Sequence, residues 1–141
     1  MAQEFGELSD FIDGGGIAFS FNGERFEIDP TAHDVLQFQK NYRDLATESK
    51  LSGENMLKLG AKLAGGDLNL ETLEFEGGVA AELVNKGASF AQVNRLMLTI
   101  VTKYWFNDDA ATEYYQTGDM GKALGLKQEK RKTARKSQKT D

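Results

Sequence analysis

The stretch SFAQVNRLMLTIVTKYWF, at residues 89–106, constrains the fold of this chain more than any other segment. Its large apolar residues recur three or four positions apart, as they do on one face of an α-helix. They are Phe90, Val93, Met97, Ile100, Val101 and Tyr104. Ser89 stands three residues before Gln92, which is the capping-box pattern of a helix start. The pattern predicts a long helix that runs to Phe106 and forms the centre of the core.

A β-hairpin is predicted near the N-terminus, in the stretch IAFSFNGERFEIDP at residues 17–30. Large apolar residues alternate with small or polar ones on both sides of a turn: Ile17, Phe19, Phe21, Phe26 and Ile28. The turn itself is Asn22-Gly23, a strong hairpin signal, because both central positions of a type I′ turn need a positive φ. A lone hairpin is marginally stable in water, so we expect its apolar face to pack on helices.

Two helices are expected after the hairpin. The first begins at Asp29-Pro30, with Asp29 as the N-cap and Pro30 in the first turn, and ends near Glu48. Its buried stripe is Val35, Phe38, Tyr42 and Leu45. The second follows Ser52-Gly53 and stops at Gly65-Gly66. Its apolar residues at helical spacing are Met56, Leu59 and Leu63.

The segment DLNLETLEFEGG, at residues 67–78, leaves the choice between strand and helix open. Gly77-Gly78 favours a break, followed by a helix from about Val79 to Asn85. A last helix is expected after Asn107-Asp108 and before Gly118. Its inward residues are Ala111, Tyr114 and Tyr115. The predicted fold class is mainly α: a small helical domain with one N-terminal β-hairpin.

The C-terminal stretch KALGLKQEKRKTARKSQKTD differs in charge from everything before it. The whole chain has 17 basic and 22 acidic residues, and the last 20 have eight and two, so residues 1–121 carry a net charge of −11 and the tail +6. We therefore expect a helical domain at 1–121 and a flexible basic tail at 122–141, whose removal leaves the domain folded because the tail adds almost no apolar burial. The central basic residues are Lys127, Lys130, Arg131, Lys132, Arg135 and Lys136. Binding of phosphates, a solvated extension and contact with an acidic partner or a neighbouring copy are all compatible with this charge.

No residue pattern points to catalysis. The chain has no cysteine and one histidine, His33, beside Asp34 in the first turn of a predicted helix. The glycine runs lack the spacing of phosphate-binding loops and indicate turns and helix stops. We expect no enzyme activity, no cofactor and no metal. The acidic N-terminus is not a signal peptide, and the most apolar stretch is too short to span a bilayer, so a cytoplasmic protein is expected and no membrane contact.

The layout of the whole chain resembles the tail assembly chaperones of long-tailed bacteriophages with actinobacterial-type hosts. FGELSDFID followed by IAFSFNGERFEIDP is similar to that family's acidic start, two strands and Pro-led helix. The block VNKGASFAQVNRLMLTIVTKYWFNDDAATEYYQTGD is similar to its Gly turn, long apolar helix with an aromatic end, acidic break and closing AxxYY helix. The Lys/Arg/Ala/Ser/Thr-rich tail is similar as well.

The resemblance implies a chaperone without an active site. Such proteins coat the long, apolar, helical tape-measure protein while tail-tube subunits assemble around it, and are then released. It also implies that the chain is the short form of a programmed-frameshift pair, whose longer form recruits the tail-tube protein, and that the basic tail is a linker. The protein would act in the host cytoplasm and be absent from the mature virion.

Residues for binding the partner are sought on the apolar helices, because an apolar helix is bound in an apolar groove. The candidates are Met56, Leu59, Leu63, Met97, Trp105 and Phe106. Each also fits a place in the core, which is the commoner role of apolar residues at helical spacing. Association of copies into a homo-oligomer is compatible with the charge pattern. The alternatives are a structural virion component, such as a head–tail connector or tail-completion protein, and a nucleic-acid-binding accessory protein that uses the basic tail, although nucleic acid is not the expected partner.

Overall fold

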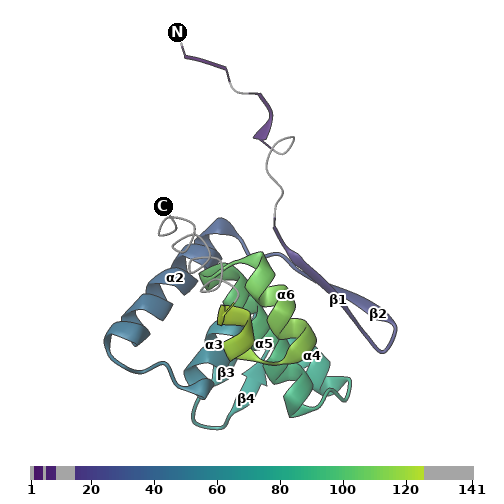
Figure 1. Cartoon of the computed structure of the whole chain (residues 1–141). Helices are drawn as coiled ribbons and strands as arrows, with labels where there is room; N and C mark the ends of the chain where they lie inside the picture. The colour runs from purple at the N-terminus through teal and green to yellow at the C-terminus, as the bar shows by residue number, and fades with distance from the viewer. Residues whose placement is uncertain (1, 5, 9–14, 126–141) are drawn as a thin grey trace, which may run out of the picture.

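Helix α5, Phe90–Trp105, lies at the centre of the computed structural model, which describes residues 2–4, 6–8 and 15–125 (Figure 1). The other elements are β1 Ile17–Phe21, β2 Glu24–Ile28, α2 Ala32–Thr47, α3 Gly53–Leu63, β3 Asp67–Asn69, β4 Glu74–Glu76, α4 Gly78–Asn85 and α6 Asp108–Thr117. The predicted class, mainly helical with an N-terminal hairpin, is confirmed. The basic residues at 127–136 lie outside the described residues.

The N-terminal hairpin has the predicted turn. Asn22 and Gly23 both have a positive φ, and Phe19 pairs with Phe26 across the two strands. Their rings stack with centroids 5.2 Å apart. Figure 1 shows the hairpin on one side of the helical body and α2 on the other.

The start of α2 differs from the prediction. Its N-cap is Thr31, not Asp29, and Pro30 precedes the cap. Thr31 accepts a hydrogen bond from the Asp34 backbone N–H, and the Asp34 carboxylate accepts one from the Thr31 N–H. This reciprocal pair satisfies two backbone donors, which Asp29 does not do, and so it sets the start of the helix. Helix α2 ends at Thr47, as expected.

Residues 67–78 form a second, short hairpin of β3 and β4, which answers the question that the sequence left open. The two glycine pairs that flank it meet at its base. A Cβ on Gly66 would lie 2.2 Å from the carbonyl oxygen of Gly77, and one on Gly78 would lie 2.5 Å from the backbone nitrogen of Gly66. These glycines therefore allow two backbone segments to touch, in addition to ending α3 and preceding α4.

Helix α5 begins with the predicted capping box of Ser89 and Gln92 and buries Val93, Met97, Ile100 and Val101. The prediction that Phe90 faces the core is wrong, because its side chain is exposed. Phe90 stands in the first turn, at the corner after α4, where none of the described helices covers its side chain. In α6 the sequence prediction holds for Ala111 and Tyr114 and fails for Tyr115, which is exposed because it lies about 100° around the helix from Tyr114.

After a break at Gly118 and Asp119, the chain is helical again and remains so beyond the boundary expected at Gly121. Residues 120–125 are helical, and Ala123 has no exposed surface. It packs against Ala110 and Tyr114 of α6, while Lys122 forms a salt bridge with Glu113 at 3.2 Å. The expectation that residues after Gly121 add almost no apolar burial is therefore wrong for Ala123.

This packing predicts different stabilities for two truncations. A chain that ends at Gly121 should lose about 1–2 kcal/mol of unfolding free energy relative to one that ends at Gly125, because Ala110 and Tyr114 lose their cover. Urea unfolding followed by circular dichroism measures the difference, with the full chain as reference. Equal midpoints for the two truncations would show that Ala123 contributes nothing.

Candidate partner-binding surface

The six apolar residues proposed as partner contacts do not gather on one open surface. Leu59, Leu63 and Met97 are buried in the main core. Met56 and Trp105 are half-buried and pack against the same core, and Phe106 packs against the smaller cluster around Ala110 and Tyr114. A contact role for the three half-buried residues stays a prediction, whereas the three buried ones have no surface to offer a partner in this structure.

Trp105 is held by two aromatic neighbours on α2. Its ring stacks on Tyr42 with centroids 3.9 Å apart and meets Phe38 edge-on at 6.4 Å. Burial raises the pKa of the Tyr42 hydroxyl above its ordinary value. These contacts join α2 to the end of α5.

A surface that sequence periodicity missed surrounds Phe90. We call it the Phe90 groove, a hollow of about 460 Å³. Its apolar lining is Leu73, Phe75, Ala81, Val84, Ala88, Phe90 and Val93. Phe90 is 70% exposed, Leu73 54% and Val84 47%. The groove therefore gathers three of the large apolar side chains that lie most open to solvent on the described chain.

Leu73 stands at the rim of this groove in an unfavourable backbone conformation. Its φ is 60°, a region that residues with a bulky side chain rarely adopt, at a cost of about 1 kcal/mol. Asn69 stabilises the turn: its carbonyl accepts a hydrogen bond from the Leu73 N–H at 2.7 Å, and its side chain accepts from Glu71 and Thr72. The strain is not offset by burial of Leu73, and such strain is commonly found at binding sites.

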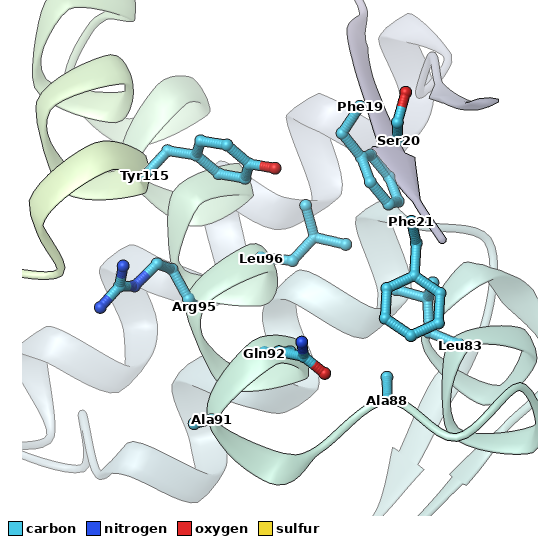
Figure 2. Close-up of a pocket in the computed structure, with 10 residues that line it drawn as sticks. All are labelled: Phe19, Ser20, Phe21, Leu83, Ala88, Ala91, Gln92, Arg95, Leu96 and Tyr115. Carbon is cyan, nitrogen blue, oxygen red and sulfur yellow. The ribbon is translucent and has the colours of Figure 1, made fainter. Parts of the chain in front are cut away.

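A second hollow, also of about 460 Å³, lies between the hairpin and α5, and we call it the hairpin groove (Figure 2). Phe19 and Phe21 of β1 form one wall, and Leu83, Leu96 and Tyr115 lie across from them. Ala88, together with Gln92 and Arg95 of α5, also lines this groove. Ala88 lines the Phe90 groove too, so the two grooves adjoin at the corner between α4 and α5.

Polar contacts hold the hairpin at both ends. Near its turn, Lys86 forms salt bridges with Glu24 of β2 and, at 3.4 Å, with Glu82 of α4. The hydrogen bond with Glu24 raises the pKa of Lys86. At the other end, the Tyr104 hydroxyl donates to the Gly15 carbonyl at 3.1 Å, and burial, followed by Asp29 and Asp108, raises the pKa of that hydroxyl. These contacts tie the two ends of the hairpin to α4 and α5.

A catalytic histidine, a metal site and a membrane-spanning helix are the other features to consider among the described residues. His33 lies in the first turn of α2, as predicted, and its side chain is exposed. No group of three or more His, Cys, Asp or Glu side chains is placed to hold a metal ion in the part of the chain described here. Within the same residues, no helix has both the length and the apolar character needed to cross a bilayer.

A family model described as "Domain of unknown function (DUF7426)" matches residues 6–141. No curated protein and no solved structure matches the chain. Because the match covers nearly the whole sequence, the chain belongs to the DUF7426 family.

Proposed function

We propose that this protein is a phage tail assembly chaperone, the short form of a frameshift pair, which binds the tape-measure protein and keeps it soluble while tail-tube subunits assemble. Two observations support the proposal. The sequence block at residues 84–119 resembles that family, and the domain presents an open apolar groove around Phe90. The proposed protein has no catalytic step.

The Phe90 groove is the observation that carries the proposal. Its three most exposed apolar residues come from three separate elements: the β3–β4 turn, α4 and the start of α5. The exposed polar residues Glu74 and Asn85 also line it. An amphipathic helix binds such a groove by its apolar face. Phe90 offers an anchor, and the side chains of Leu73 and Val84 lie where they can flank a partner side chain.

The size of the groove fits weak and repeated binding. Covering the exposed parts of its three rim residues would contribute about 3 kcal/mol, which corresponds to roughly a hundredfold in affinity. One such contact is too weak to hold a partner alone. Many copies along one long partner would add avidity, and each copy could still be released when tube subunits arrive. We place this activity in the host cytoplasm, with the basic residues at 127–136 in a linker to the domain of the longer form.

Replacing Phe90 with aspartate tests the proposal. Phe90→Asp should leave the fold intact, because the side chain is 70% exposed, and should weaken binding at least about tenfold, because an ion would have to enter the apolar contact. The assay is co-expression with the tape-measure protein, scored by that protein's solubility and by co-elution at high salt. High salt is used because it screens charge contacts and leaves apolar ones.

Leu36→Asp is the matched control. Leu36 is 65% exposed on α2 and lines neither groove, so this variant should bind as the unaltered protein does. Circular dichroism confirms that both variants are folded. If Phe90→Asp binds normally, or if both variants lose binding equally, the Phe90 groove is not the contact surface.

A further inference from the structure

The inward face of β1 is only partly covered. Phe26 and Ile28 of β2 are buried, whereas their cross-strand partners Phe19 and Ile17 remain half-buried. Phe21 at the end of β1 is half-buried as well. The hairpin thus packs on the helices by its β2 side and leaves an apolar strip along β1.

This strip continues into a channel. The hairpin groove lies beside Phe19 and Phe21, and a further hollow of about 330 Å³ lies beside Ile17. Tyr115 of α6 lines both hollows and is 43% exposed. We call the two together the β1 channel. It follows the whole of β1, which at about 3.3 Å per residue is roughly 16 Å long.

We propose that the β1 channel binds the N-terminal segment of a second copy of this chain, residues 4–12. The segment, EFGELSDFI, alternates acids with large apolar residues. The apolar ones are Phe5, Leu8, Phe11 and Ile12. Residues 2–4 and 6–8, which the structure describes, are all exposed, and Leu8 is 70% exposed, so these residues do not cover the channel of their own chain. The segment brings large apolar side chains that can pack against the partly exposed side chains of Phe19, Phe21 and Tyr115.

The charges of the two surfaces are complementary. Glu4, Glu7 and Asp10 make the segment acidic. Arg95 lies on the α5 wall of the channel, and within the described chain it forms no salt bridge. Figure 2 shows its guanidinium directed away from Phe19 and Phe21, and it lies beside Gly118, the C-cap of α6, at one edge of the channel. A segment whose apolar side chains enter the channel would place its acids near this edge.

The connection between the N-terminal segment and β1 is compatible with exchange of segments between two copies. The Tyr104 hydroxyl holds Gly15 beside the end of α5, so the segment is tethered to its own domain at this point. Gly15 has a φ of 77°, a conformation that favours glycine, and in the sequence Gly14 and Gly16 flank it. Two copies that exchange segments form a symmetric dimer with two identical contacts, the commonest form of homo-oligomer.

The first experiment compares the mass of the full chain with that of a chain lacking residues 1–13, by light scattering on a sizing column. We expect a dimer for the full chain and a monomer for the shortened one. A fluorescent peptide of residues 2–13 should bind the shortened chain, and a scrambled peptide of the same composition should not. Tyr115→Asp in the full chain should give a monomer, while Leu36→Asp should remain a dimer.

A dimer that persists without residues 1–13, or a peptide that fails to bind the shortened chain, overturns the proposal. A monomeric full chain overturns it too: if the peptide then binds only the shortened chain, the segment lies in its own channel instead. Circular dichroism shows whether Tyr115→Asp is folded, and the peptide assay decides independently of that variant. No tape-measure protein is present in these measurements, so their outcome is separate from that of the proposed function.

Discussion

Replacing Gly60 with alanine should lower the free energy of unfolding by about 3 kcal/mol. Gly60 lies on the face of α3 that touches α5. A Cβ there would stand 2.6 Å from the carbonyl oxygen of Met97 and 2.9 Å from the Met97 Cβ. Neither atom is the end of a flexible side chain, so the two helices must move apart. That movement would loosen the packing of Leu63 and Met97, which are both fully in the core.

Urea unfolding followed by helical circular dichroism measures this effect, and Gly53→Ala is the matched control. Gly53 is the first residue of the same helix, and nothing lies within 4 Å of a Cβ placed on it. Alanine there should be neutral or stabilise by about 0.5 kcal/mol, because it restricts the unfolded chain. If the two variants unfold alike, α3 and α5 are not in contact at Gly60.

Replacing Trp105 with alanine should also cost about 3 kcal/mol of stability. The change removes the ring that stacks on Tyr42 at 3.9 Å and meets Phe38, and with it the aromatic contact that fastens α2 to α5. Trp105→Phe should cost less, since a smaller ring keeps part of the contact. Circular dichroism is the suitable readout, because the variants lack the chain's single tryptophan.

This experiment also decides the role of Trp105. The sequence suggested it as a partner contact, and the structure places it among aromatic residues of α2. A stable Trp105→Ala variant that no longer co-elutes with the tape-measure protein would return Trp105 to a contact role. A Trp105→Ala variant that is unstable, while its Phe90 groove is unaltered, would show that Trp105 stabilises the fold.

The local elements were predictable because their signals lie within a few residues of one another. Asn22-Gly23 can specify a hairpin turn by itself, and Ser89 with Gln92 can specify a helix start, since each depends on backbone groups of neighbouring residues. The start of α2 was misplaced because two local caps competed. Thr31 has a partner in Asp34, and the reciprocal pair determined the start.

The candidate site was not predictable in the same way, because exposure depends on what covers a residue. Apolar spacing on α3 and α5 selected Leu59, Leu63 and Met97, which the fold buries. The same spacing assigned Phe90 to the core, and the fold leaves it open at the α4–α5 corner. Periodicity identifies the apolar face of a helix, but it does not say where along that face the neighbouring helix ends.

What the sequence by itself determined is helices α2 to α6, the N-terminal hairpin and the capping box of α5, since these depend on local backbone hydrogen bonds and spacing. Only the tertiary structure decided that the two glycine pairs touch, that Ala123 belongs to the core, and that the β1 strip and the Phe90 groove stay open. Those features come from contacts between segments far apart in the chain. Their physical origin is the packing of one element against another, which no pattern within a single element contains.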